Sequence, residues 1–335
     1  MKKDNEGLLI DHPRFNDEFY GYKRIENLFI RQINNKNLSN AYLFYGIKGL
    51  GKATFAFRLS RFLLMKKKES KYENLFVPKN DSTFKTIASL THPDFNLIEK
   101  DKTTKKINTD LLQSIIKVAY STNLESEYKI IIVDSLNNIS TNKAYNILLK
   151  LLEDCPSKCI FLLIAHSLSK IPSTLLSRCQ KIYFNPLPKE KLKQWFSKTK
   201  QVNKNYINTI LNLSNGSLGK AIDIINNQEY IEILNQSNSL VKNLNKLKMN
   251  TLDDFFFLYN KNLDINFFLL IIQFSISDFI KNLSKENNQE EKINIYLSLY
   301  FEINKNINNF KVFNLDENQS LKIIKYTLIK HSNIN

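Results

Sequence analysis

Three residues with the spacing of a phosphate-binding loop follow an apolar segment near the N-terminus. Gly46, Gly51 and Lys52 fit the pattern G-x-x-x-x-G-K within the run YGIKGLGKAT, and Gly49 adds a third glycine. In such a loop the backbone N–H groups surround phosphate oxygens, the lysine reaches the terminal phosphates, and the following helix dipole favours negative charge. The spacing predicts a nucleotide-phosphate site, although a glycine turn that binds nothing can contain the same residues.

The residue after Lys52 departs from this pattern. A Ser or Thr normally stands there and binds magnesium through its hydroxyl, but this chain has Ala53, and Thr54 comes one position late. A methyl group cannot ligate a hard cation that requires oxygen ligands. We therefore predict that the loop glycines, Lys52 and Thr54 contact ATP or ADP and that the chain supplies no metal ligand here. Whether either nucleotide binds is left open by the sequence.

A second candidate for the same site is a carboxylate at the end of an apolar segment. The run KIIIVDS, residues 129–135, has the continuous apolar character of a central parallel strand, and ligands of open α/β sheets bind at the carboxyl ends of their strands. Asp134 is expected either to be the acid that organises magnesium in phosphate-loop ATPases or to cap the strand. Ser135 stands where the hydrolytic proteins carry Glu, and a hydroxyl is a poor base near neutral pH. We expect no intrinsic ATPase activity.

Two further groups of residues could carry chemistry. The apolar run 159–165 ends at His166, whose side chain could sense a γ-phosphate or cap the strand. Cys155 and Cys159 form a C-x-x-x-C pattern with no second Cys or His pair nearby in the sequence. Zinc sites need about four such ligands, so free buried thiols are the favoured interpretation and no zinc is expected.

The elements that would position these residues indicate an α/β fold followed by helices. Five apolar segments of strand length alternate with helical patterns before residue 188, which predicts a mostly parallel, doubly wound sheet. From residue 189 the pattern is helical, with a break at the residues NGSLG, 215–219. We predict a core domain at residues 1–188, a small helical domain at 189–238 and an all-α bundle at 239–335.

The composition restricts the class of protein. The 335 residues include 48 Lys and Arg against 32 Asp and Glu, a formal charge of +16 that suits nucleic acid. Much of the chain is Asn, Lys and Ile, however, and such a bias places cations on any surface, so direct DNA binding stays open. No uninterrupted apolar run approaches membrane-spanning length, and three cysteines without framework spacing suit a reducing compartment. We expect a cytoplasmic protein without a membrane partner.

The order of the motifs is more specific than any one of them. GIKGLGKAT, THPDF, IIIVDS, NKAYNILLKLLEDCPSKCIFLLIAHSLSKIPSTLLSRC and NGSLGKA together resemble the clamp-loader branch of the AAA+ proteins. Within that branch the chain is similar to the delta-prime subunits of bacterial DNA polymerase III. The resemblance covers residues 20–227 and implies an AAA+ P-loop core, a helical lid and a collar-like oligomerisation domain. It also implies partners: gamma/tau and delta subunits in a hetero-pentameric ring that loads a sliding clamp onto primer-template DNA at the nucleoid-associated replisome.

The resemblance further implies a role for Arg178. The triplet Ser177-Arg178-Cys179 matches the SRC motif of this branch, whose arginine acts in trans as an arginine finger on a neighbour's ATP. Lys220 stands where the GS-x-G-R-A element has its arginine, so it is a candidate nucleotide sensor that lacks the bidentate fork. The expected function is that of a non-hydrolysing stator. The alternatives are an active AAA+ ATPase, either a clamp-loader motor or a helicase-related protein, and a structural or DNA-binding module with a vestigial loop.

Overall fold

A computed structural model describes most of the chain, in two compact units. The described residues are 12–66, 72–101, 104, 106–139, 141–156, 158–198, 206–259, 264–286, 289–313 and 315–332. The first unit is Met1–Ile222 and the second is Asp223–Asn335. All residues singled out by the sequence patterns above belong to the first unit.

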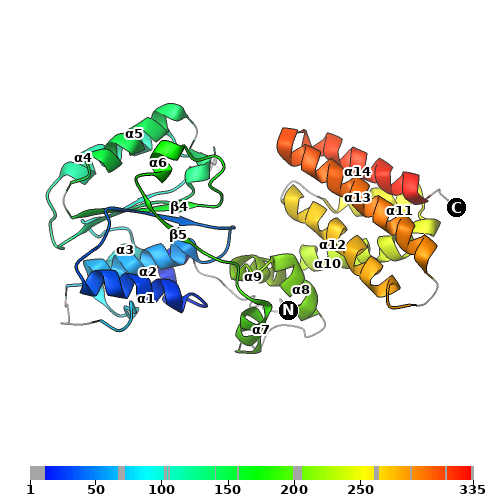
Figure 1. The fold of residues 1–335 in the computed structure, drawn as a ribbon, viewed down its shortest axis with the longest axis horizontal. Coiled ribbons are helices and arrows are strands. Elements are labelled where there is room, and N and C mark those ends of the chain that lie inside the picture. Colours follow the sequence, from blue (N-terminus) through cyan, green and yellow to red (C-terminus); the bar gives the residue numbers. More distant parts are fainter. Residues whose placement is uncertain are drawn as a thin grey trace, which may run out of the picture. The chain divides into compact units, whose positions relative to one another are not determined.

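The first unit is built around a sheet of five parallel strands (Figure 1). The strands are β1 (Ala41–Tyr45), β2 (Phe95–Ile98), β3 (Lys129–Val133), β4 (Cys159–Ala165) and β5 (Gln180–Tyr183). Their order is β2-β3-β4-β1-β5, so that β1 lies between β4 and β5. The predicted parallel α/β sheet is confirmed.

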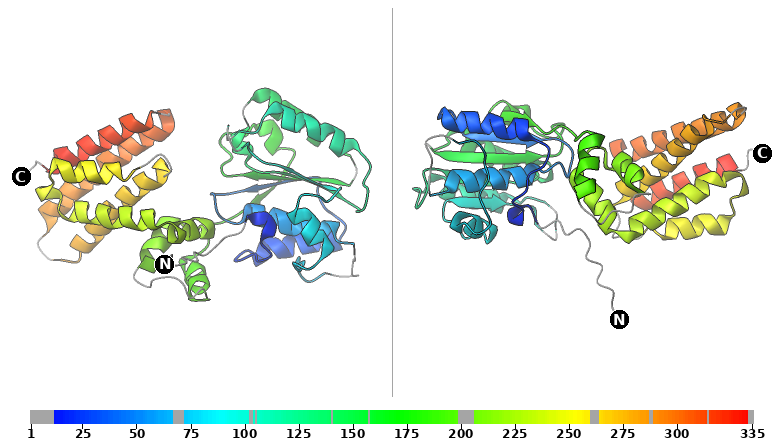
Figure 2. Two further views of the ribbon diagram at one scale, coloured as in Figure 1. Left: turned by 180° about the vertical axis from the view of Figure 1, so that it is seen from behind. Right: turned by 90° about the horizontal axis from the view of Figure 1, so that it is seen from below.

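Helices cover both faces of this sheet, as Figures 1 and 2 show. One face carries α1 (Lys23–Asn34), α2 (Lys52–Leu64) and α3 (Ser82–Ala88), and the other carries α4 (Thr109–Tyr120), α5 (Asn142–Glu153) and α6 (Ser173–Leu176). Successive side chains of a strand point to opposite faces. Leu43 accordingly joins the cluster that contains Leu148 of α5, whereas Phe44 packs on Phe29 and Phe55 of α1 and α2. Short 3₁₀ turns, η1 (Pro13–Phe15) and η2 (Leu136–Asn138), precede α1 and follow β3.

The chain continues in three short helices after the sheet. They are α7 (Lys189–Lys198), α8 (Ile207–Ser214) and α9 (Leu218–Asn226). Asn215 and Gly216 separate α8 from α9 in the left-handed backbone conformation, with φ of 48° and 79°. The predicted break at residues 215–219 is confirmed, because a left-handed residue after the last turn ends a helix.

The described part of the second unit consists of helices. They are α10 (Gln228–Lys242), α11 (Met249–Phe257), α12 (Ile265–Leu283), α13 (Glu290–Phe313) and α14 (Glu317–Ser332), with the 3₁₀ turn η4 (Leu244–Lys246). α12 packs on α10 and α13, and α13 packs on α14. Tyr296 is buried and donates a hydrogen bond to the Val241 carbonyl oxygen at 2.7 Å. The predicted helical C-terminal region is confirmed.

Among the described residues, one helix of this unit is long and apolar enough to cross a membrane by length and composition alone. It is α12, with 19 residues, although Gln273, Ser275 and Asp278 interrupt its apolar run. Its buried residues include Phe268 and Ile272, and its contacts with α10 and α13 are those of the central helix of a bundle. We therefore interpret α12 as a core helix.

The division into two units does not test the three domains predicted at residues 1–188, 189–238 and 239–335, and their boundaries stay a prediction. α7 and α8 belong to the first unit and α10 belongs to the second. The boundary after Ile222 falls within the segment 189–238 that the sequence assigned to a separate small domain.

Candidate phosphate-loop site and the Arg178 turn

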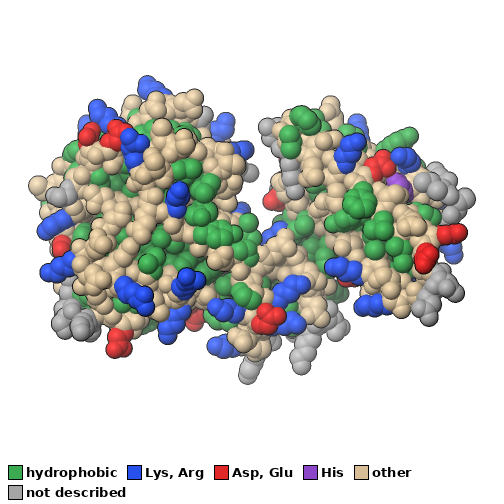
Figure 3. Space-filling model, viewed as in Figure 1, with side chains coloured by type: hydrophobic (Ala, Val, Ile, Leu, Met, Phe, Trp, Pro, Cys, Tyr) green, Lys and Arg blue, Asp and Glu red, His purple; other side chains and the backbone are tan. Residues whose placement is uncertain are grey.

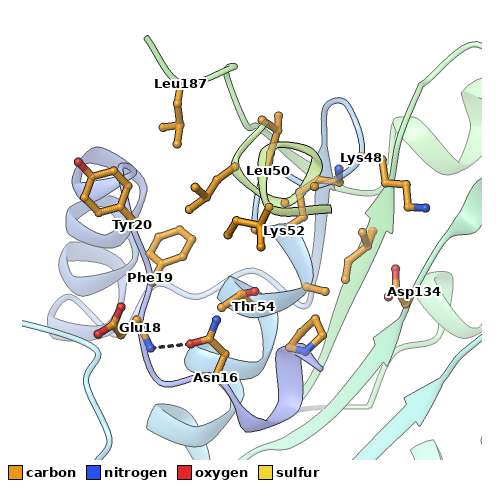
Figure 4. Close-up of a pocket in the computed structure, with 18 of the residues that line it drawn as sticks. Asn16, Glu18, Phe19, Tyr20, Lys48, Leu50, Lys52, Thr54, Asp134 and Leu187 are labelled. Carbon is orange, nitrogen blue, oxygen red and sulfur yellow. Dashed lines mark hydrogen bonds between the residues drawn. The ribbon is translucent and has the colours of Figure 1, made fainter. Parts of the chain in front are cut away.

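A cavity of about 560 Å³ lies beside the phosphate loop, within the first unit. Its size is within the usual range for small-molecule sites. Figure 4 shows Phe19, Tyr20 and Leu187 at one end of the cavity and Asp134 at the other, with Lys52 between them. One end is therefore aromatic and apolar, as a base requires, and toward the other end Lys48 and Lys52 supply the positive charge that phosphates require.

Most of the lining comes from four regions of the chain, and Lys79, Lys100, Leu187 and Trp195 complete it. It includes the segment before α1, the phosphate loop with the start of α2, the ends of β3 and β4, and the start of α9. Of the predicted nucleotide contacts, those that line the cavity are Gly49, Gly51, Lys52, Thr54 and Asp134. Gly46 supports the loop from outside the lining. Lys220 is not among the lining residues, and its predicted contact with nucleotide stays a prediction.

The phosphate loop connects β1 to α2 as the spacing predicted. Gly46 has φ of 138°, and a Cβ added there would lie 2.5 Å from the carbonyl oxygen of Phe184. The loop therefore passes the end of β5 so closely that only glycine fits. α2 begins at Lys52, directly after Gly51, so its first N–H groups have no partners within the helix. These N–H groups and the helix dipole are suited to an anion.

The side chain of Lys52 is turned onto its own loop. Its Nζ donates hydrogen bonds to the carbonyl oxygens of Gly46 at 2.6 Å and Ile47 at 2.7 Å, and the residue is 3% exposed. Burial lowers the pKa of Lys52 to about 8, against the opposing effect of Asp134. The amine is therefore still mostly protonated at neutral pH, and its charge is held at the base of the loop.

The residues around Lys52 fit phosphates and do not fit a phosphate-bound magnesium ion. Ala53 lines the cavity and has no ligand oxygen. Asp134 lies at the end of β3 and accepts a hydrogen bond from the Ser135 hydroxyl at 3.2 Å. Burial raises the pKa of Asp134 above its ordinary value. One carboxylate without the hydroxyl after Lys52 leaves the usual magnesium site incomplete.

His166 lies at the end of β4 and lines the cavity. Asn137 caps this strand end, because its Oδ1 accepts the backbone N–H of His166 at 2.6 Å. The His166 Nδ1 is buried and has no hydrogen-bond partner among the described residues. Burial, together with the cations Lys52 and Lys48, lowers the pKa of His166 to about 4, so the imidazole is neutral at pH 7. Strand capping thus falls to Asn137, and the imidazole is available to the cavity.

The start of α9 is in direct contact with the phosphate loop. The Gly219 N–H donates to the Gly49 carbonyl oxygen at 2.9 Å, and the Ser217 hydroxyl donates to the Lys48 carbonyl oxygen at 2.9 Å. A Cβ on Gly49 would lie 2.4 Å from Ser217 Oγ, and one on Gly219 would lie 2.9 Å from Gly49 Cα. Lys220 joins the same turn through its N–H, which donates to Ser217 Oγ at 3.2 Å. Two glycines therefore bring two backbones together and fasten α9 to the loop.

A segment that the sequence patterns missed forms another wall of the cavity. Residues 13 and 16–20 line it, and two arginines of α2 hold them there. Arg61 donates to the carbonyl oxygens of Arg14 and, at 2.7 Å, of Asn16, while Arg58 donates to the Asp17 carbonyl oxygen at 2.9 Å. The Arg61 guanidinium is buried 3.8 Å from the centre of the Phe84 ring, and burial lowers its pKa to about 10. The aromatic run FNDEFYG was the available signal.

Arg178 lies in a different environment, in the turn after α6. Its Nη2 pairs with Glu153 Oε1 of α5 at 2.5 Å, and its Nη1 donates to the Thr174 carbonyl oxygen at 2.8 Å. The side chain is 37% exposed, whereas the next residue, Cys179, is buried. Arg178 is not among the residues that line the cavity. The SRC triplet thus places its cysteine in the core and its arginine at the surface.

The cysteines form no metal centre in the described part of the chain. Cys155, Cys159 and Cys179 are free thiols, and Cys155 Sγ donates to the Cys159 carbonyl oxygen at 3.4 Å. Among the described residues, no three His, Cys, Asp or Glu side chains are placed to hold a metal ion. Burial raises the pKa of Cys179 to about 12, which keeps that thiol protonated and unreactive.

Comparison with known proteins identifies the family. Residues 21–188, half of the chain, match the model of the family described as DNA polymerase III, delta subunit. The chain belongs to this family. A curated relative from Bacillus subtilis named DNA polymerase III subunit delta' is 28% identical to this family member over 210 residues, which are 62% of this chain and 60% of the relative. The delta' subunit of Buchnera aphidicola is 32% identical over 171 residues, 51% of this chain and 48% of the relative.

Related subunits support the same branch. The DNA polymerase III subunit gamma/tau of Mycoplasma genitalium is 26% identical over 210 residues, 61% of this chain and 34% of the relative. A solved Thermotoga maritima structure, a gamma subunit-related protein of DNA polymerase III, has a TM-score of 0.50 at 15% identity, over 92% of this chain and 100% of that one. That likeness concerns the fold alone. The resemblance to delta-prime subunits drawn from the motifs is confirmed, and the match spans less than two thirds of these curated relatives.

Proposed function

We propose that this chain is a clamp-loader subunit that hydrolyses no ATP itself and supplies Arg178 to the ATP site of a neighbouring subunit. The observation that carries the proposal is the separation of two cations. Lys52 is buried in the chain's own phosphate loop, whereas Arg178 is outside the cavity, partly exposed and held by one carboxylate. Arg178 can therefore contact a nucleotide bound to a second subunit more readily than one bound in the cavity of its own chain.

The chain's own cavity lacks two parts that hydrolysis requires. Ala53 offers no oxygen to magnesium, and Ser135 offers a hydroxyl where a carboxylate base would orient water. The loop N–H groups and Lys52 would hold the phosphates of ATP or ADP, and the segment around Phe19 would contact the base. The phosphates of a bound nucleotide would supply negative charge beside the phosphate loop and the start of α9. This chain would not take part in hydrolysis of that nucleotide.

Arg178 has the chemistry that a phosphoryl-transfer site needs from a neighbour. Its guanidinium donates to Glu153 and to the Thr174 carbonyl oxygen, and a γ-phosphate in place of Glu153 would accept the same kind of bond. An arginine supplied in this way is worth about 10³- to 10⁵-fold in rate. The proposed partners are gamma/tau and delta subunits in a pentameric ring in the cytoplasm, acting on a sliding clamp and primer-template DNA.

The test is reconstitution with gamma/tau and delta subunits from the same source. The purified chain should show no ATP turnover. In the complex, Arg178→Ala should leave assembly intact and reduce DNA-stimulated turnover at the neighbouring site by about 10³-fold or more. Arg178→Lys should not rescue turnover, because an ammonium cannot make the bidentate fork. Lys117→Ala, an exposed change on α4, is the matched control.

Two results would contradict the proposal. Normal turnover of the Arg178→Ala complex would exclude an arginine acting in trans. Turnover by the purified chain that disappears in Lys52→Ala would favour an active AAA+ ATPase instead.

A further inference from the structure

A second hollow of the first unit, of about 920 Å³, lies along strand β5. We call it the β5 groove. Helix α1 forms one wall. Gln32 Nε2 of α1 donates to Gln180 Oε1 of β5 at 3.1 Å, and Tyr22 Oη, just before α1, donates to the Asn185 carbonyl oxygen, just after β5, at 2.8 Å. These two bonds hold α1 beside β5.

Strand β5 is an edge of the sheet and presents unused backbone groups to this groove. It pairs with β1 on one side, and no other described strand pairs with it. The Phe184 N–H donates to the Tyr45 carbonyl oxygen at 2.8 Å, so Phe184 points its backbone groups toward β1. Because alternate residues of a strand direct these groups to opposite sides, Lys181 and Tyr183 direct theirs outward.

The side chains around these outward groups are cationic. The groove is lined by Lys23, Arg24, Arg31, Lys181 and Lys191, and by no Asp or Glu. In the described part of the chain, none of these five cations is in an ion pair; the nearest acid of α1, Glu26, pairs instead with Arg58 at 2.8 Å. Figure 3 shows that Lys and Arg side chains outnumber Asp and Glu on the side of the first unit seen there.

Apolar surface lies between the cations. Arg24 and Arg31 are seven residues apart, so they lie two turns apart on one face of α1, with Leu28 between them. Leu28 is 37% exposed, whereas the ring of Tyr183 packs on Tyr45 with a centroid distance of 5.0 Å. A lysine on an edge strand is a common protection against aggregation, which accounts for Lys181. Lys191 Nζ donates to the Gly21 carbonyl oxygen at 3.0 Å, but neither explanation accounts for the cations of α1.

We propose that the β5 groove binds an acidic peptide segment of another protein, which adds to β5 as an extended strand. Such a segment uses every feature of the groove: its backbone pairs with Lys181 and Tyr183, its carboxylates meet the cations, and its apolar side chains cover Leu28. A phosphate chain has only acceptors and would leave the outward carbonyl groups unpaired. Four strand residues at about 3.3 Å each span about 13 Å, which suits a bound segment of about four to six residues.

The first experiment uses the full chain and a fluorescein-labelled hexapeptide in which Glu alternates with Val. Fluorescence anisotropy should detect binding that weakens with salt, because the contacts are largely ionic. Arg24→Glu combined with Arg31→Glu should weaken it at least tenfold, while Lys117→Glu on α4 should not change it. Hydrogen exchange should show slower exchange in residues 180–184 when the peptide is bound. Absence of binding by the unmodified chain would overturn the proposal.

A matched pair of variants tests strand addition itself. Lys181→Thr removes the cation and keeps the outward N–H, whereas Lys181→Pro removes both without disturbing a bond to β1. The proline variant should bind the peptide several-fold more weakly than the threonine variant, with both unfolding at the temperature of the unmodified chain. Equal affinities of the two folded variants would overturn strand addition. Displacement of the peptide by a ten-residue thymidine oligonucleotide, without slower exchange at residues 180–184, would indicate a phosphate site instead.

Discussion

The phosphate loop and the Arg178 turn both place a cation beside the sheet, but the two cations differ in what they contact. Lys52 is 3% exposed and bonds to two carbonyl oxygens of its own loop. Arg178 is 37% exposed and bonds to one carboxylate and one carbonyl oxygen at the surface. An exposed ion pair is worth about 0–1 kcal/mol, so its partner can be exchanged cheaply, whereas a buried amine without its partners is costly. The comparison indicates exchangeable contacts for Arg178 and fixed contacts for Lys52.

The same contrast extends to the backbone around each cation. The phosphate loop is tied to β5 through the close approach of Gly46 and to α9 through Gly49 and Gly219. The Arg178 side chain restricts its turn less, because its contacts are one ion pair with Glu153 and one hydrogen bond to the Thr174 carbonyl oxygen. Substitutions in the phosphate loop are therefore expected to lower the unfolding free energy of the chain. Substitutions in the Arg178 turn are expected to change ATP turnover in a complex instead.

The largest effect on stability is expected at Gly46. Gly46→Ala introduces a Cβ 2.5 Å from a backbone oxygen at φ of 138°, whereas Gly51→Ala at φ of 85° has its nearest neighbour at 3.6 Å. Gly46→Ala should cost about 2–4 kcal/mol of unfolding free energy and Gly51→Ala about 1–2 kcal/mol. Urea unfolding followed by Trp195, the single tryptophan and part of the first unit, measures both. A loss at Gly51 equal to that at Gly46 would contradict the close approach of Gly46 to β5.

The next effect is a pH dependence that belongs to Lys52. Its pKa of about 8 in the folded chain lies below the ordinary lysine value of 10.5, so between these values the unfolded chain binds more protons. Stability of the unmodified chain relative to Lys52→Met should therefore rise with pH across that interval, by at most about 1.4 kcal/mol per pH unit. Below pH 8 the difference should be level. Unfolding curves from pH 7 to 10 measure this difference in unfolding free energy, with Lys117→Met as the matched control. A difference that falls as the pH rises would contradict the lowered pKa of a buried Lys52 amine.

The local pattern of apolar residues and glycines in the sequence was sufficient to predict most of the fold and part of the candidate site. The strand at residues 129–133 and the helix ending at Leu64 follow from uninterrupted or periodic apolar residues, and the loop follows from glycine spacing. The contact between Gly49 and Gly219 joins residues 170 positions apart, and no periodicity reports such a contact. Residues 13–20 were missed for the same reason, because the carbonyl oxygens that Arg58 and Arg61 hold are common to every residue type.

The smallest effect is expected at Glu153, the partner of the exposed Arg178. Glu153→Gln removes the carboxylate that holds Arg178, and the unfolding free energy should change by less than about 1 kcal/mol, because the pair is half-exposed. If Glu153 competes with a neighbour's phosphate for the guanidinium, ATP turnover of the reconstituted complex should stay level or rise by up to about fivefold, the equivalent of 1 kcal/mol. Asp154→Asn makes the same charge change one residue later and is the control. Loss of turnover in Glu153→Gln as large as in Arg178→Ala would mean that Glu153 orients the arginine, and the contacts of the turn would then be as fixed as those of the phosphate loop.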